Sequence, residues 1–307
     1  MNYHELLDLD REPFSNSPDP DFFYASRQHM GCLQKLELSI RLNRGLSVVL
    51  ADVGTGKTTM CRQLIRRLAT DDKVETHLLL DPGAGDGYEF LSVIARMCGE
   101  TESTEGRSER ELKEMIKNHL FTRTVEQQGT VVLIIDEGQK LAPFSVEILR
   151  EFLNFETNEH KLLQIVIFAQ REFEQTLDNH PNFADRVSLF ERLEPLGFGE
   201  TRSMIRYRLA QAGAKDPDRY FSLAGYLGVH RATGGYPRKI VELCHRALLA
   251  LIIQNTDRVG WSLAWASSRR GKKPAPRRFS WGFATVVAML VVALLVGANA
   301  WKTDTTA

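Results

Sequence analysis

Residues 46–69 read LSVVLADVGTGKTTMCRQLIRRLA, the strongest structural signal in the chain. The apolar run 46–50 predicts a buried strand, and the apolar spacing after residue 57 predicts a helix. The loop between them, residues 51–58, follows A-x-x-x-x-G-K-T, which is the Walker A pattern with alanine in place of its first glycine. Strand, loop and helix in this order favour a phosphate-binding loop over a chance glycine-rich turn.

This loop has the chemistry to hold ATP. Backbone N–H groups of Gly54, Gly56 and Lys57 can surround a phosphate at the start of the following helix. We expect Lys57 to reach the β- and γ-phosphates and the Thr58 hydroxyl to coordinate Mg²⁺. The predicted nucleotide-binding residues are Ala51, Asp52, Val53, Gly54, Thr55, Gly56, Lys57, Thr58 and Thr59.

A second signal lies in residues 130–141, TVVLIIDEGQKL. The apolar run predicts a central strand of a parallel sheet, whose carboxyl edge is where ligands bind in open α/β folds. Asp136 and Glu137 follow the strand directly. We expect Asp136 to hold Mg²⁺ together with Thr58, and Glu137 to polarise the water that attacks the γ-phosphate. An acidic pair here is commonly a turn or a helix cap, and the presence of Lys57 favours the catalytic interpretation.

Strand patterns at 74–81 and 162–170 alternate with helical patterns such as those within 86–120. The alternation predicts an α/β core over 46–195, in which helices flank a central parallel sheet. Gln170 ends one of these strands. Its amide is a candidate sensor of the γ-phosphate or a holder of the attacking water, with an ordinary turn residue as the alternative.

Three arginines are candidate catalytic residues. Arg186 is a candidate arginine finger that would complete the site of a neighbouring subunit in a ring, Arg192 competes for this role, and a surface arginine is the alternative for both. Residues 196–258 predict a small helical lid, in which Pro237 opens a helix after two glycines. We expect Arg238 to sense the γ-phosphate and couple lid angle to nucleotide state, with a water-facing arginine as the alternative.

These patterns together predict a P-loop NTPase of the AAA+ type. In this organisation residues 1–45 form an N-terminal segment and first helix, ahead of the core and the lid. The chain has 39 basic and 39 acidic residues, so it has no bulk attraction to nucleic acid. The four cysteines have no CxxC pair and no histidine at zinc-ligand spacing, which predicts buried, reduced thiols.

The last part of the sequence predicts a membrane anchor. Residues 281–301, WGFATVVAMLVVALLVGANAW, carry no charge and have roughly the 20-residue length of a spanning helix, with a buried core helix as the alternative. The linker 259–280 contains RRGKKPAPRR, whereas the tail 302–307 is KTDTTA. The positive-inside rule therefore places residues 1–280 in the cytoplasm. The N-terminus has no apolar run typical of a secretory signal.

Several stretches together carry a family resemblance: EPFSNSPDPDFFYASRQHM near the N-terminus, DVGTGKTT, LIIDEGQKL, FETNEHKLLQIVIFAQREF and TGGYPRK. On these motifs the chain resembles the ExeA, or general secretion pathway protein A, group of AAA+ ATPases over about residues 3–300. The most distinguishing positions are Pro13, Phe14, Pro18, Asp19, Pro20, Tyr24 and His29. Contact of this aromatic segment with adenine is one expectation.

The resemblance implies an ATPase of the bacterial inner membrane that assembles or positions an envelope machine, such as a type II secretion secretin or a pilus system. It implies a ring-like homo-oligomer with envelope assembly proteins as partners. It carries over the roles of Lys57, Thr58, Asp136, Glu137 and Arg238. A DNA-binding helper ATPase of the transposition type is the alternative, and the neutral charge and the apolar segment count against it.

Overall fold

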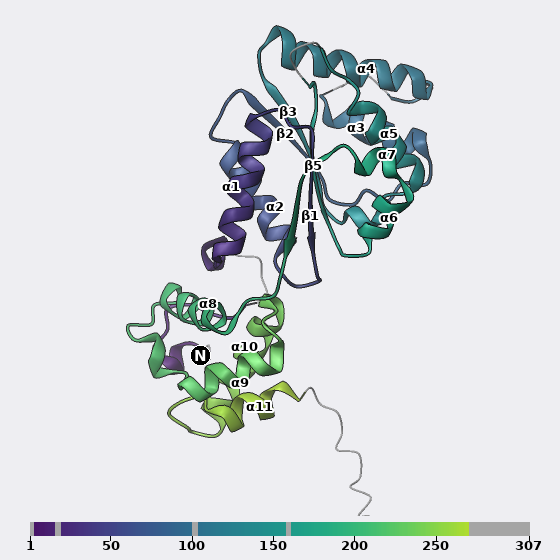
Figure 1. Cartoon of the computed structure of the whole chain (residues 1–307). Coiled ribbons are helices and arrows are strands. Elements are labelled where there is room, and N and C mark those ends of the chain that lie inside the picture. The colour runs from purple at the N-terminus through teal and green to yellow at the C-terminus, as the bar shows by residue number, and fades with distance from the viewer. Residues whose placement is uncertain (1–2, 16–19, 100–103, 158–160, 270–307) are drawn as a thin grey trace, which may run out of the picture. The chain divides into compact units, whose positions relative to one another are not determined.

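A computed structural model describes residues 3–15, 20–99, 104–157 and 161–269 of the chain. They form an α/β core followed by a group of helices (Figure 1). The strands are β1 (Leu46–Ala51), β2 (Val74–Leu79), β3 (Thr130–Ile135), β4 (Gln164–Ala169) and β5 (Val187–Leu193). The helices are α1 (Arg27–Arg41), α2 (Lys57–Leu68), α3 (Gly87–Met97), α4 (Glu109–Phe121), α5 (Pro143–Phe152), α6 (Phe173–Asn179), α7 (Pro181–Ala184), α8 (Phe198–Gln211), α9 (Leu223–Thr233), α10 (Pro237–Ile253) and α11 (Trp261–Ser268).

The sheet has five parallel strands in the order β2-β3-β4-β1-β5. This confirms the predicted P-loop α/β core with a parallel sheet flanked by helices. The strand β1 lies between β4 and β5, so the loop that follows it starts near the middle of the carboxyl edge. The strand β5 lies at one edge of the sheet and was not among the strands that the sequence patterns predicted.

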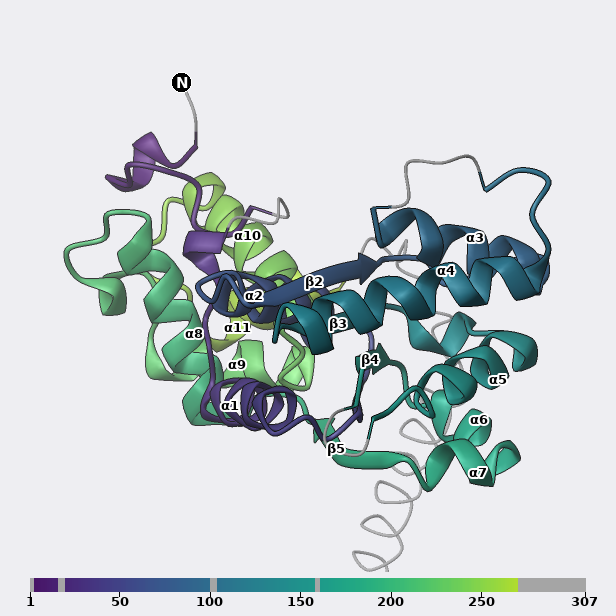
Figure 2. The same ribbon diagram turned by 90° about the horizontal axis from the view of Figure 1, so that it is seen from above.

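Both faces of the sheet are covered (Figures 1 and 2). Along β3, Leu133 and Ile135 pack into the cluster formed with α3, α4 and α5, whereas Val132 and Ile134 pack into the cluster formed with α1 and α2. Successive side chains of a strand point to opposite faces, so a run of apolar residues is what a strand buried on both faces requires. Because the strands are parallel, the polar residues that follow the central strands lie at the same carboxyl edge of the sheet.

The helices α8 to α10, which cover the predicted lid 196–258, form their own hydrophobic core together with α11, and we call this helical group the lid. The N-terminal segment contributes to this core, because Leu7, Leu9, Phe14 and Phe22 are buried in it. The side chain of Arg208, on α8, fixes the segment by donating from Nε to Pro13 O at 2.8 Å and from Nη1 to Phe22 O at 3.0 Å. The segment before α1 therefore packs on the lid.

The range 259–280, which the sequence indicates as a linker, begins with a helix. In α11, Leu263 and Ala264 are buried against the lid core. A Cβ on Gly228, in α9, would lie 3.1 Å from Ala264 Cβ, so the two helices approach closely. No helix among the described residues is long and apolar enough to cross a membrane. The predicted span 281–301 and the tail 302–307 lie outside the described residues.

Candidate nucleotide-binding site

The phosphate loop joins β1 to α2 and depends on two glycines. Gly54 has φ +85° and Gly56 has φ +106°, both in the left-handed region that favours glycine. Between them, Thr55 Oγ1 donates to Asp52 O at 2.7 Å and closes the turn. Gly56 is the N-cap of α2 and offers no side-chain cap, so N–H groups of the first helical turn are available to an anion.

Lys57 lies inside the loop and is 6% exposed. Its Nζ donates to Ala51 O at 2.8 Å and to Asp52 O at 3.3 Å. Burial lowers the pKa of Lys57, while the nearby carboxylates of Glu137 and Asp136 oppose this shift. The ammonium group is thus held across the loop by backbone carbonyls, where a phosphate group could replace them as its partner.

Thr58 and Asp136 meet at the edge of the sheet. Thr58 Oγ1 donates to Asp136 Oδ2 at 2.8 Å, and Asp136 is 2% exposed. The backbone N–H of Asp136 donates to Leu79 O at 2.9 Å, which fixes the acid relative to β2. A hydroxyl and a carboxylate oxygen side by side are the ligand types that Mg²⁺ prefers, so these residues fit that ion.

Glu137 is held in an uncommon backbone conformation with φ +55°. Its Oε2 accepts from Gln139 Nε2 at 2.6 Å and faces Gln170 Nε2 at 3.4 Å. Gln139 Oε1 in turn accepts from the backbone N–H of Gln170 at 2.9 Å. The two amides therefore orient the carboxylate. Sequence reasoning missed Gln139, although its place two residues after the acidic pair was a usable signal.

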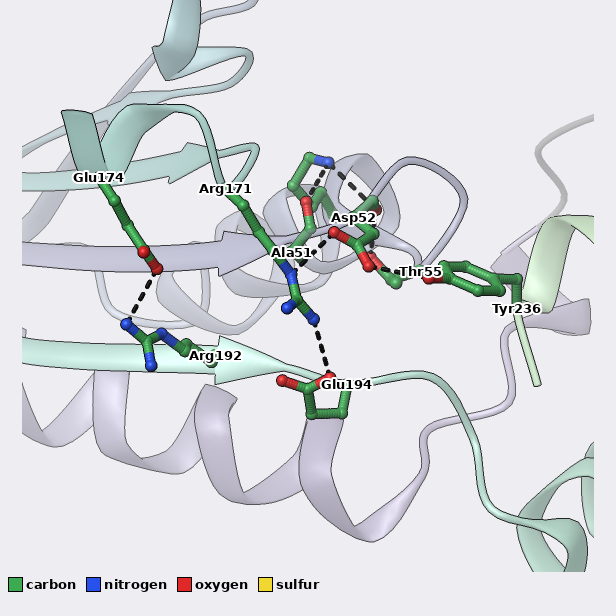
Figure 3. Close-up of polar contacts among 9 residues, drawn as sticks. Ala51, Asp52, Thr55, Arg171, Glu174, Arg192, Glu194 and Tyr236 are labelled. Carbon is green, nitrogen blue, oxygen red and sulfur yellow. Dashed lines mark hydrogen bonds and ion pairs between the residues drawn. The ribbon is translucent and has the colours of Figure 1, made fainter. Parts of the chain in front are cut away.

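Asp52 connects the loop to the core and to the lid (Figure 3). Its Oδ1 pairs with Arg171 Nε at 2.9 Å, and its Oδ2 accepts from Tyr236 OH at 2.9 Å. Arg171 also pairs with Glu194, which follows β5 at the start of the connection to the lid, at 2.9 Å. Asp52, which the sequence predicted only as part of the phosphate loop, therefore joins Arg171 of the core to Tyr236 of the lid.

Arg238 begins α10 beside the loop. Its backbone N–H donates to Gly54 O at 3.1 Å, and a Cβ on Gly54 would lie 3.1 Å from Arg238 Cβ. Its side chain is 71% exposed and lies 3.7 Å from Glu242. The arginine is therefore next to the phosphate loop with a guanidinium group that has room to move.

Most of these groups line a cavity of about 700 Å³ between the core and the lid, whereas Ala51, Asp52 and Asp136 are not among its lining residues. Its lining includes the predicted residues Val53, Gly54, Thr55, Gly56, Lys57, Thr58, Thr59, Glu137, Gln170 and Arg238. The cavity is also lined by Phe22, Phe23 and Tyr24 of the N-terminal segment. The segment expected to contact adenine therefore reaches the cavity with three aromatic side chains, while Phe14 is buried in the lid core.

His29, in α1, contacts the phosphate loop and also lines the cavity. It is 3% exposed, its Nδ1 lies 2.7 Å from Ser26 Oγ, and its Nε2 lies 3.1 Å from Thr55 O. Burial lowers the pKa of His29, although its hydrogen bond to the Thr55 carbonyl opposes the shift. Sequence reasoning singled out His29 without a role, because only the fold brings α1 to the loop.

The two candidate finger arginines lie at opposite ends of β5. Val187, next to Arg186, pairs with Leu46 at the start of β1, so Arg186 lies at the edge of the sheet away from the phosphate loop. Arg192 pairs in register with Leu50, one residue before Ala51, and its guanidinium binds Glu174 at 2.9 Å (Figure 3). The structure therefore does not bring Arg186 to the site of its own chain.

A family model described as AAA domain matches residues 40–177. The chain is 32% identical over 262 residues to general secretion pathway protein A from Aeromonas hydrophila. The match covers 84% of this chain and 46% of the relative, so the chain spans about half the length of that curated relative.

Solved structures share the fold at low sequence identity. The ORC2 protein of Aeropyrum pernix, in ADPNP–ADP complexes, is 15% identical with a TM-score of 0.61, over 84% of this chain and 71% of that chain. Drosophila ORC bound to DNA is 19% identical with a TM-score of 0.62, over 87% and 65% of the two chains. The RuvB branch migration motor of Thermotoga maritima is 17% identical with a TM-score of 0.52, over 80% and 72%. Fold, motifs and sequence relative agree: residues 40–177 match an AAA domain, and the chain is similar to general secretion pathway protein A over 84% of its own length.

Proposed function

We propose that this chain binds ATP in the cavity between the core and the lid and hydrolyses it. The observation that carries the proposal is the meeting of four side chains from two strand ends: Lys57 and Thr58 after β1, and Asp136 and Glu137 after β3. A lysine across a glycine-rich loop, a hydroxyl beside a carboxylate, and a second, oriented carboxylate are the groups that phosphoryl transfer requires.

Each group has a distinct task in the proposed reaction. The loop N–H groups and Lys57 bind the phosphates. Thr58 and Asp136 hold Mg²⁺, which would neutralise charge on the phosphate oxygens. Glu137, oriented by Gln139 and Gln170, accepts a hydrogen bond from the attacking water and takes its proton. Gln170 and Arg238 sense the γ-phosphate from the core and from the lid.

The working form is proposed to be a ring-like homo-oligomer. Arg186 supports this, because it lies at the edge of the sheet away from the loop of its own chain, where a neighbouring subunit could approach it. A neighbour's arginine would stabilise charge on the transferred phosphoryl group. Arg192 is the second candidate, although its guanidinium is engaged by Glu174.

We further propose that residues 281–301 anchor the chain in the bacterial inner membrane, with the ATPase domain in the cytoplasm. The apolar sequence and the basic residues before it support this placement. The helix α11 adds support, since Trp261 and Trp265 stack at 5.7 Å between ring centroids and are 42% and 39% exposed. Tryptophan is favoured at a membrane interface. Partners are proposed to be secretin or pilus assembly components.

The test uses the purified full chain and three variants. Lys57→Ala should lose ATP binding. Glu137→Gln should bind ATP as the wild type does but release phosphate about 100-fold more slowly, which is the lower range of general-base contributions. Glu147→Gln, on the exposed surface of α5, is the matched control. Equal phosphate release by the wild type and Glu137→Gln would exclude Glu137 as the base.

The envelope role is tested in cells with Glu137→Gln, which should hold the ATP-bound form. Crosslinking followed by mass spectrometry of the membrane fraction should recover secretion or pilus components together with other copies of the chain. Recovery in the membrane fraction should require residues 281–301. Recovery of recombinase or DNA instead would contradict the envelope role while leaving the ATPase assignment intact.

A further inference from the structure

We infer that His77, Cys98 and His119 form a binding site for one thiophilic divalent cation such as Zn²⁺, separate from the nucleotide site. One ring nitrogen of each histidine and Cys98 Sγ all lie within 4.8 Å of one another. The spacing of these residues in the sequence gives no zinc motif. The fold alone assembles them, because His77 lies on β2, Cys98 follows α3, and His119 is near the end of α4.

The ligand set is appropriate to zinc. Imidazole and thiolate are each common ligands of zinc, and a thiolate disfavours Mg²⁺ and Ca²⁺. Bonds of about 2.0–2.3 Å to a tetrahedral ion place the ligand atoms roughly 3.5 Å apart. The ligand atoms lie up to 4.8 Å apart, so the side chains must rotate to close on an ion.

Metal-bound histidines commonly donate their other ring N–H to a carboxylate, and Glu75 lies beside both histidines. Its Oε1 lies 2.7 Å from His77 Nε2 and 2.8 Å from His119 Nε2. Where Nε2 of each ring donates to Glu75, Nδ1 is the nitrogen whose lone pair is free for a metal, and the carboxylate fixes the ring orientation. Arg123 pairs with the other carboxylate oxygen of Glu75 at 2.5 Å, which holds this group in place.

The surroundings provide space and access for an ion. A cavity of about 10 Å³ lies against His77 and Cys98, and its other lining residues are apolar, among them Ile94 and Leu133. That volume is close to the space of one water-sized sphere. The His77 and His119 side chains are 14% and 20% exposed, so an ion can arrive from solvent.

A bound cation would join the edge strand β2 to the two helices α3 and α4 that cover it. Because the ligands come from three elements, binding is coupled to the folded arrangement and should raise its stability. The inference does not depend on ATP hydrolysis, so it stands or falls separately from the proposed function.

The test is titration of the metal-free full chain with Co²⁺, which reports thiolate coordination through a sulfur-to-cobalt absorption band in the near ultraviolet. We expect one equivalent of Co²⁺ to develop the band and Zn²⁺ to abolish it by competition. Cys98→Ser should remove the band. Glu75→Gln should keep the band and weaken binding by about 10–100-fold, as for other partners of metal-bound histidines.

The matched control is Cys32→Ser, since Cys32 is also buried but lies in α1, away from the histidines. This variant should keep the band. A second measurement guards against misfolding: Zn²⁺ should raise the thermal unfolding temperature of the wild type and of Cys32→Ser, and not that of His119→Gln. Absence of the band in the wild type, or a band unchanged in Cys98→Ser, would overturn the inference.

Discussion

The hydroxyl of Tyr236 donates to Asp52 Oδ2 at 2.9 Å, and this bond ties the helical lid to the phosphate loop. Nearby, the backbone N–H of Arg238 donates to Gly54 O at 3.1 Å. Both lid residues open α10, and both acceptors belong to the loop that would surround a phosphate. A change in the loop on nucleotide binding must therefore be felt at the lid, which is the arrangement of a hinge-type switch.

We expect Tyr236→Phe to weaken ATP binding by roughly three- to tenfold, the range of one net hydrogen bond. Without the bond to Asp52 the lid is less well held over the loop, so part of the free energy of ATP binding is spent on ordering the lid. Fluorescent-nucleotide titration measures the affinity. Tyr88→Phe is the control, because Tyr88 OH donates to Thr104 O at 2.7 Å, in a different part of the core. Equal affinities for the two variants would rule out the coupling.

We expect Gln139→Ala to lower kcat for ATP hydrolysis by about tenfold and to leave ATP affinity unchanged. Gln139 donates to Glu137 at 2.6 Å and accepts from the backbone N–H of Gln170 at 2.9 Å without belonging to the phosphate loop, so its loss should disturb the orientation of the carboxylate and leave the phosphate contacts in place. Steady-state phosphate release and nucleotide titration separate the two quantities. Gln175→Ala, in α6, is the control. A large loss of affinity in Gln139→Ala would show that the residue binds nucleotide instead.

The buried His29 should make the stability of the chain depend on pH. Burial lowers its pKa below the ordinary 6.5, so as the pH falls below 6.5 the unfolded chain takes up a proton that the folded chain does not. The free energy of unfolding should then decrease, by up to about 1.4 kcal/mol per pH unit, until folded His29 is also protonated.

Denaturant unfolding of His29→Gln at several pH values should show a shallower decrease than the wild type shows. His180→Gln, which replaces a histidine outside the cavity lining, should follow the wild type. Parallel curves for the wild type and His29→Gln would mean that His29 is not held neutral in the folded chain.

Gly235, at the entry to α10, should tolerate no side chain. Its φ is +79°, and an added Cβ would lie 2.1 Å from Leu196 O. We expect Gly235→Ala to destabilise the chain by about 3 kcal/mol, from backbone strain and overpacking together. Gly199→Ala is the matched control, since no heavy atom lies within 4 Å of an added Cβ there. Thermal unfolding compares the two, and equal unfolding temperatures would refute the steric argument.

The sequence by itself predicted the α/β core, because its signals are local. A run such as 131–135 specifies a strand buried on both faces, and the glycine-lysine-threonine loop carries its chemistry within a few residues. The structure confirms the parallel sheet and brings Lys57, Thr58, Asp136 and Glu137 to one edge of it. Their roles in ATP binding and hydrolysis stay predictions. The predicted anchor 281–301 lies outside the described residues.

Only the tertiary structure decided which distant residues meet. Tyr236 reaches Asp52, His29 reaches Thr55, and Arg208 holds the N-terminal segment on the lid, each across a chain separation that no local pattern encodes. The strand β5 escaped prediction because polarity does not follow burial along this edge strand: Phe190 is 40% exposed, whereas the side chain of Glu191 is 20% exposed. The periodicity of apolar residues indicates which side of a segment faces the core. Contacts between distant segments depend instead on how the layers of helices and strands pack against one another.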